Sequence, residues 1–165
     1  EFRRVLFQST DSQDSRCQLC RDLGADRVID YKTEDFVETV RTMGGANVIL
    51  DIVGGANIEK NIKAASPDAR IIQLAFAAGS KVEINLMPVM LKRLVYTGST
   101  LRTRPVAYKT RVARELEAQV WPLIEAGKIR VVTGRTFPLA QAAAAHAMME
   151  SAGHTGKILL TVAGT

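Results

Sequence analysis

The chain has 165 residues, a length typical of one domain, and its 47% hydrophobic and 24% charged residues argue against disorder. The net charge of +5 is scattered, and the densest basic stretch, residues 102–114, adjoins Glu115 and Glu117, so we expect no nucleic-acid binding. No run of about 18 apolar residues is present, and we therefore expect no membrane partner.

Cys17 and Cys20 form a CxxC pair inside a stretch with helical spacing. A structural zinc site needs two further ligands, and a thioredoxin-type pair would follow a strand and open a helix. We therefore interpret both cysteines as small side chains in a helix, in a protein from a reducing compartment. No signal peptide is visible, so a cytoplasmic protein without a metal site is expected.

Apolar runs and helical patterns alternate over residues 17–101. The run NVILDIV is apolar enough to form a parallel strand that is buried on both faces. The predicted strands are Arg27 to Asp30, Asn47 to Val53, Arg70 to Phe76 and Leu94 to Thr100. The predicted helices are Cys17 to Leu23, Asp35 to Met43, Ala56 to Ala65 and Met87 to Arg93. This alternation predicts βαβ units and a doubly wound parallel sheet, hence an α/β fold.

The pattern changes after Leu101. Apolar residues at helical spacing predict a long helix over residues 106–126, which Pro122 kinks or divides and Gly127 ends. There follow a predicted strand over residues 128–133, a turn at 137–139, an alanine-rich helix over 141–150 and a strand over 157–162. Because no linker rich in Gly, Ser or Pro is present, one compact unit is expected.

Six sequence strings occur in a characteristic order. They are LGADRVIDY (23–31), NVILDIVGG (47–55), NIKAA (61–65), MLKRLVYTGSTLR (90–102), VWPLIEAGKI (120–129) and HTGKILLTV (154–162). Together they resemble the zeta-crystallin-like NAD(P)H quinone oxidoreductases, a zinc-free branch of the medium-chain dehydrogenase/reductase superfamily. The resemblance implies a GroES-like catalytic domain, a Rossmann domain and a C-terminal segment that returns to the catalytic domain.

The first Rossmann strand and its glycine-rich turn are not found, because no glycine precedes Gly24. We therefore expect the C-terminal half of such an enzyme. Residues 10–130 would form an incomplete Rossmann-type sheet, and residues 131–165 would belong to the catalytic domain. A sheet of order 3-2-1-4-5-6 without its first strand has unpaired edges. Residues 1–9 are either the start of the second strand, at Val5 to Phe7, or a cloning or assembly artefact.

The resemblance also implies a nicotinamide cofactor. After the second Rossmann strand, an acidic residue favours NAD, whereas hydroxyl and basic groups favour the 2′-phosphate of NADP. Ser12, Gln13 and Arg16 lie in this stretch, and Tyr31 matches a tyrosine beside it. A guanidinium binds phosphate with two charge-assisted hydrogen bonds, so NADP is expected. Asp11 as a ligand of the ribose hydroxyls keeps NAD possible, and Arg16 would then be a solvated helix residue.

Further cofactor residues are expected at the carboxyl ends of the later strands, where ligands bind in open α/β sheets. They are Val53, Gly54, Leu74, Ala75, Phe76, Ser99, Thr100 and Leu101, to which the resemblance adds Lys157. For Gly54 and Gly55, the alternative role is a strand-to-helix turn.

The implied reaction is hydride transfer from NADPH to a quinone or a similar activated carbonyl, by a parent enzyme that is expected to be a homodimer. No catalytic residue is identified in this half, so the isolated chain is expected to be inactive. The alternative is a non-catalytic truncated domain that self-associates or binds nucleotide weakly.

Overall fold

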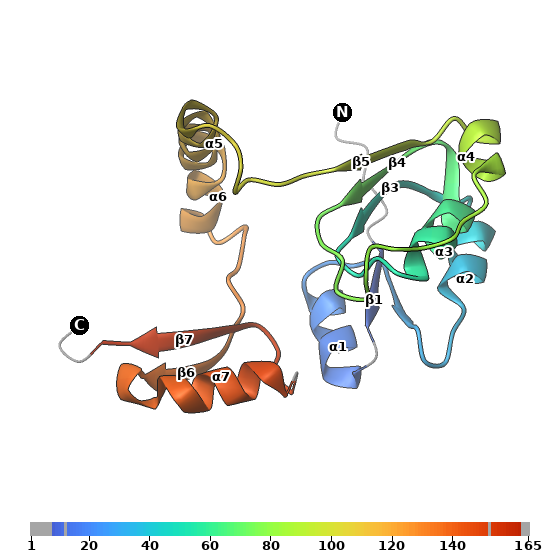
Figure 1. The fold of residues 1–165 in the computed structure, drawn as a ribbon. Coiled ribbons are helices and arrows are strands. Elements are labelled where there is room, and N and C mark those ends of the chain that lie inside the picture. The colour runs from blue at the N-terminus through green and yellow to red at the C-terminus, as the bar shows by residue number, and fades with distance from the viewer. Residues whose placement is uncertain (1–7, 12, 152, 163–165) are drawn as a thin grey trace. The chain divides into compact units, whose positions relative to one another are not determined.

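The computed structural model describes residues 8–11, 13–151 and 153–162, and the chain divides into two units, Glu1–Thr103 and Arg104–Thr165 (Figure 1). The expectation of one compact unit is therefore wrong. Every residue from 99 to 105 is exposed, so this stretch acts as a linker without the composition that usually indicates one. We call the two parts the first unit and the second unit.

The first unit alternates strands and helices, as predicted (Figure 1). Its elements are β1 (Gln8–Asp11), α1 (Asp14–Asp22), β2 (Arg27–Asp30), α2 (Phe36–Thr42), β3 (Ala46–Asp51), α3 (Asn57–Ala64), β4 (Ala65–Gln73), α4 (Met87–Leu91) and β5 (Val95–Gly98). The four strands and four helices predicted up to residue 101 are all found, β2 at its predicted bounds and the others with shifted boundaries. The strand interpretation of Val5 to Phe7 concerns residues outside the described part of the chain, whereas β1 begins at Gln8.

All strand pairs of the first unit are parallel, which confirms the α/β class. β1 pairs with β2, and β4 lies between β3 and β5 in a separate sheet. Among the described residues no strand joins β1 to β3, so each of these strands has an edge without a strand partner. Two groups of strands with unpaired edges are what the expected sheet gives when its first strand is left out.

The main core lies between the three-stranded sheet and α3. Ile58 and Ile62 of α3 pack against Ala69 and Ile71 of β4, and all four side chains are buried. Val89 of α4 packs on the edge of the same cluster. Burial of these aliphatic side chains holds α3 and α4 on the three-stranded sheet. This packing fixes the positions at which the loops between the strands and these helices begin.

A second cluster connects the two groups of strands. Ile29 of β2, Val40 of α2 and Ala64 of α3 are buried together, and Ala46 at the start of β3 packs against them. The β1–β2 pair is therefore attached on the β3 side of the three-stranded sheet, which decides which end of a dinucleotide each loop could reach.

The face of β3 that points away from α3 is exposed, although the strand was expected to be buried on both faces. Val48 and Leu50 are 60% and 67% exposed, and Ile52 just after the strand is exposed as well. Successive side chains of a strand point to opposite faces, and the helices that pack on β4 cover only one of them. Within the described residues, helices therefore cover one face of this strand, and the expected burial of the other face is not found.

An ion pair joins Asp68 in β4 to Arg93 just before β5. Arg93 Nε donates to Asp68 Oδ1 and Nη2 donates to Oδ2, each at 2.7 Å. Both residues have positive φ angles, 62° and 53°. The hydrogen bond from Arg93 lowers the pKa of Asp68. A carboxylate with a lowered folded-state pKa adds stability above its unfolded pKa, about 3.9, and that contribution is lost as the pH falls through the folded value.

We predict that Asp68→Asn flattens the acid side of the stability profile. Below about pH 5, wild type should lose more of its free energy of unfolding than the variant does. Asparagine also tolerates a positive φ, so the backbone should remain unstrained. Urea unfolding at several pH values measures the effect, and Arg93→Gln should flatten the profile in the same way. A variant with the wild-type profile would contradict the role given to this ion pair.

The second unit contains α5 (Val106–Gln119), α6 (Trp121–Glu125), β6 (Thr133–Pro138), the 3-10 turn η1 (Leu139–Gln141), α7 (Ala142–Glu150) and β7 (Lys157–Thr161). The predicted long helix is divided at Val120, as expected from Pro122. The helix predicted over residues 141–150 and the strand predicted over 157–162 are confirmed, with small shifts at their ends.

Two other predictions for this unit are wrong. The strand expected over residues 128–133 begins only at Thr133, and it continues through Phe137 and Pro138, which were predicted as part of a turn. β6 pairs in parallel with β7, from Thr133 opposite Lys157 to Pro138 opposite Thr161. Pairing with a distant strand, and not the local apolar run before Thr133, therefore determines where this strand lies.

Candidate cofactor site

Three of the predicted cofactor segments begin at one edge of the three-stranded sheet. Asp51 at the end of β3 lies opposite Gln73 at the end of β4, and Gln73 lies opposite Gly98 at the end of β5. The residues expected at the cofactor follow directly: Val53, Gly54, Leu74, Ala75, Phe76, Ser99, Thr100 and Leu101. Of these, only Gly54 is buried, so the other side chains are accessible to a ligand.

The loop after β3 is held by the carboxylate of Asp51, which is 5% exposed. Its Oδ1 accepts hydrogen bonds from the N–H groups of Val53 at 2.6 Å and Gly54 at 3.0 Å. Its Oδ2 accepts a hydrogen bond at 2.9 Å from Asn61 Nδ2 of α3. These charge-assisted bonds satisfy a buried carboxylate and give the loop one defined start.

The same loop packs closely on the loop after β4. The N–H of Gly55 donates to the carbonyl oxygen of Gly79 at 2.8 Å. A Cβ atom on Gly54 would lie 2.7 Å from Phe76 Cδ1, and one on Gly55 would lie 2.8 Å from the carbonyl oxygen of Ala78. Both glycines also have positive φ angles. Contact between the two loops therefore requires glycine at both positions, and the positive φ angles agree with the strand-to-helix turn that was the alternative role.

The side chain of Gln73 connects β4 with the end of β3 and with β5. Its Nε2 donates to the carbonyl oxygens of Ala75 at 2.5 Å and Asp51 at 3.2 Å. Its Oε1 accepts a hydrogen bond from the Tyr96 hydroxyl of β5 at 2.7 Å. Burial, and then the nearby Asp51 carboxylate, raise the pKa of the Tyr96 phenol, so this hydroxyl stays protonated and remains a donor.

Sequence analysis did not single out Asp51, Asn61 or Gln73 as residues of the site. A signal existed for two of them. Asp51 is the one charged residue within NVILDIV, and Gln73 interrupts the apolar run RIIQLAF at a position where alternation predicts a buried side chain. A buried polar residue needs hydrogen-bond partners, and these residues find theirs at the loops where a cofactor is expected.

The residues predicted at the adenosine end lie around the ends of β1 and β2. Asp11 is the last residue of β1, Gln13 precedes α1, and Arg16 lies half-buried in the first turn of that helix. Tyr31 follows β2 and is 55% exposed. Because β1 and β2 pair to their last residues, with Asp11 opposite Asp30, the segments that follow the two strands begin at one edge of the strand pair. Ser12 lies outside the described residues.

Lys157 belongs to the second unit. It is exposed and opens β7, opposite Thr133 of β6. The fold thus brings the other described cofactor residues into the first unit and leaves the role of Lys157 as a prediction.

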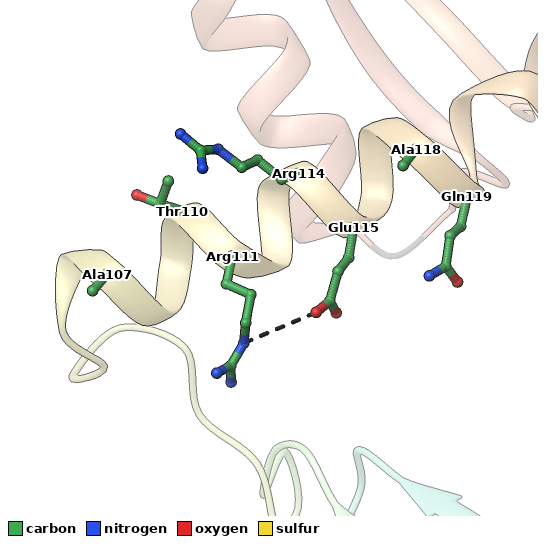
Figure 2. A pocket seen from close by; sticks show the side chains of 7 residues that line it. All are labelled: Ala107, Thr110, Arg111, Arg114, Glu115, Ala118 and Gln119. Atoms are coloured by element: carbon green, nitrogen blue, oxygen red, sulfur yellow. Dashed lines mark ion pairs between the residues drawn. The ribbon is translucent and has the colours of Figure 1, made fainter.

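A hollow of about 500 Å³ lies on α5 in the second unit (Figure 2). Its lining residues are Ala107, Thr110, Arg111, Arg114, Glu115, Ala118 and Gln119. Figure 2 shows that all of them come from one helix, where Arg111 Nε and Glu115 Oε1 form an ion pair at 3.9 Å. A furrow along one exposed helix has no second wall, and none of the predicted cofactor residues lines it.

The described ranges hold neither a group of metal-ligand side chains nor a membrane-spanning helix. In ranges 8–11, 13–151 and 153–162, no three or more His, Cys, Asp or Glu side chains are grouped so that they could hold a metal ion. Zinc independence stays a prediction. No helix in these ranges is both long and apolar enough to cross a membrane.

Curated relatives match nearly the whole chain at modest identity. A mycocerosic acid synthase-like polyketide synthase from Mycobacterium tuberculosis is 31% identical over 158 residues, 93% of this chain and 7% of that protein. A 2-haloacrylate reductase from Burkholderia is 28% identical over 92% of this chain and 46% of its own length. Quinone oxidoreductase from Rattus norvegicus is 29% identical over 83% of this chain and 41% of its own length. The chain thus spans less than half the length of each.

Solved structures give the same fold. An NAD-dependent alcohol dehydrogenase has a TM-score of 0.77 and 28% identity, and the match covers 94% of this chain and 43% of that one. The mycobacterial protein Rv1454c in complex with NADPH has a TM-score of 0.72 and 25% identity, over 93% and 48%. These matches confirm the Rossmann-type fold expected for the medium-chain superfamily.

Residues 23–160 match the zinc-binding dehydrogenase family. This range includes the loops after β3, β4 and β5, together with Asp51, Gln73 and Tyr96, which connect them. The chain belongs to the zinc-binding dehydrogenase family.

Proposed function

We propose that this chain is the cofactor-binding half of an oxidoreductase that transfers a hydride from NADPH to a quinone or a similar activated carbonyl. The observation that carries the proposal is the set of three loops at one sheet edge, joined through Gln73. The rat relative named a quinone oxidoreductase supports the substrate class. When bound, the nicotinamide would supply the hydride, and the chain would orient it.

NADP is the proposed cofactor because of Arg16. Arg16 lies in the first turn of α1, near the edge where an adenosine ribose is expected, and Tyr31 follows β2 at the same edge. The NADPH complex of the mycobacterial neighbour supports this choice. The NAD-dependent neighbour keeps NAD as the alternative, with Asp11 as the ligand of the ribose hydroxyls.

The catalytic residues of the proposed enzyme are not among those named here. We propose a cytoplasmic, zinc-independent parent that forms a homodimer, in which a segment outside this sequence supplies the rest of the substrate pocket. Titration of the purified chain with NADPH, followed by nucleotide fluorescence, tests the cofactor site directly. Saturable binding is expected, and the absence of binding would contradict the proposal.

We predict that the isolated chain shows no NADPH-dependent quinone reduction above background. The chain spans less than half of its quinone oxidoreductase relative, so the nicotinamide would lie open to water and the acceptor would not be held against it. Loss of NADPH absorbance with 1,4-benzoquinone or 9,10-phenanthrenequinone measures the rate, with the rat enzyme as positive control. Saturable turnover by the chain would show that it is more than a half-site.

A non-catalytic, self-associating domain is the second candidate function. It is favoured by the exposed apolar side chains Val48, Leu50 and Ile52 and by the edges of β1 and β3 that lack a described strand partner. Open edges and apolar patches promote pairing with other chains. Sedimentation over a range of concentrations, combined with NADPH titration, separates the two candidates. Association without NADPH binding would favour this second one.

A further inference from the structure

An amide side chain continues a stripe of buried apolar residues in β4. Ala69, Ile71 and Gln73 share one face of the strand, and they are 0%, 0% and 4% exposed. The first two belong to the aliphatic cluster under α3. Burying an amide costs free energy unless its polar atoms are hydrogen-bonded, so its presence at the end of this stripe requires a reason.

The hydrogen bonds of Gln73 supply that reason. Its side chain binds Ala75 in its own loop, Asp51 at the end of β3 and Tyr96 on β5. Its backbone carbonyl also accepts the N–H of Ser99 at 3.1 Å. The amide of glutamine can both donate and accept hydrogen bonds. The ionised carboxylate of glutamate cannot donate to two carbonyl oxygens, and the thioether of methionine cannot donate and accepts only weakly.

The order of the elements indicates which part of a cofactor these loops would meet. The β1–β2 pair, with Arg16 and Tyr31, is attached on the β3 side of the sheet. β4 and β5 lie beyond β3. A dinucleotide whose adenosine end binds at β1 and β2 would therefore bring its nicotinamide half to the loops that Gln73 connects.

Resting on the proposed function, we propose that Gln73 is a positioning residue for the nicotinamide half of the cofactor. Its side chain holds the loop that begins at Leu74 to the end of β3 and to β5, next to the loop at Ser99 that its backbone carbonyl binds, before the ligand arrives. Without it, binding would have to order these loops, and the affinity would fall by the free energy that this ordering requires. Asp51 and Tyr96 act through Gln73 and through the loop after β3.

The test compares Gln73→Met, Tyr96→Phe and the control Ile71→Val in the full 165-residue chain. Methionine keeps the length of glutamine but removes its hydrogen bonds, and Ile71→Val loosens the same core stripe without touching the loops. For each protein, the dissociation constants for NADPH and for 2′,5′-ADP, which lacks the nicotinamide half, are measured well below the unfolding temperature.

We expect Gln73→Met to weaken NADPH about tenfold and 2′,5′-ADP less than twofold. Tyr96→Phe should weaken NADPH by a smaller factor and again leave 2′,5′-ADP nearly unchanged. This milder variant still tests the proposal if Gln73→Met does not fold. Ile71→Val should change neither affinity. In the ligand-free chain, amide hydrogen exchange at residues 74–76 should accelerate most in Gln73→Met, less in Tyr96→Phe and not in Ile71→Val.

The other possible results separate the positioning role of Gln73 from the proposed function. If wild type binds both nucleotides and Gln73→Met binds them equally well, the positioning role is wrong while the proposed function stands. Equal weakening of NADPH and 2′,5′-ADP, or a matching effect of Ile71→Val, would show that Gln73 is merely structural. If wild type binds neither nucleotide, the proposed function fails and the positioning role fails with it.

Discussion

Replacing Arg16 with alanine should weaken NADPH binding by roughly 10- to 150-fold and leave NADH binding within about twofold. Only NADPH carries the 2′-phosphate, and a charge-assisted hydrogen bond to it contributes about 1.5–3 kcal/mol. Arg16 lies half-buried in the first turn of α1, where such a contact is possible. The loss should shrink at high salt, because ions screen the interaction. Fluorescence titration of the chain, or of a longer enzyme that contains it, measures both affinities.

Arg21→Ala is the matched control. It removes the same charge from the last turn of the same helix, where the Arg21 guanidinium donates to Gln18 Oε1 at 3.4 Å. This variant should bind both nucleotides as wild type does. Equal weakening of NADPH and NADH by Arg16→Ala would contradict the phosphate assignment. Selective weakening of NADH by Asp11→Ala, with a silent Arg16→Ala, would establish NAD as the cofactor.

Local sequence signals were sufficient for most of the first unit. Arg27 to Asp30 was predicted as a strand and forms β2 without any shift, because its apolar pair Val28 and Ile29 is flanked by turn residues. Pro122 was predicted to divide its helix and does, since its ring and missing N–H act within one turn. Predictions of this kind succeed where the decisive interaction spans only a few residues.

The errors arose where the decisive contacts are long-range. The run before Thr133 has strand-like residues, yet β6 lies further on, because it must pair with β7 more than twenty residues away. The interpretations of Gly54 and Gly55 likewise omitted the loop after β4, whose atoms occupy the space that a Cβ would need. Gln73 was missed for the same reason, because Tyr96, its hydrogen-bond partner, lies 23 positions along the chain.

Replacing Ile71 with alanine should lower the free energy of unfolding by about 2–5 kcal/mol. Ile71 is fully buried in β4, within the cluster that holds α3 on the sheet. Removing three carbon atoms there loses hydrophobic burial and leaves a cavity that the surrounding strands and helix can fill only in part. Urea unfolding followed by circular dichroism gives the free energy, and an unchanged slope with urea would show that the unfolded state is unaffected.

Leu50→Ala on the neighbouring strand is the matched control. Leu50 is 67% exposed and lies on the opposite face of the sheet, so its truncation should cost less than about 0.5 kcal/mol. A loss of about 2–5 kcal/mol is typical for truncation of a buried aliphatic side chain. If Leu50→Ala loses as much as Ile71→Ala, Leu50 is covered in the folded protein, and this face of β3 is not exposed in solution. A small effect for Leu50 at low protein concentration and a larger one at high concentration would mean that a second copy covers this face.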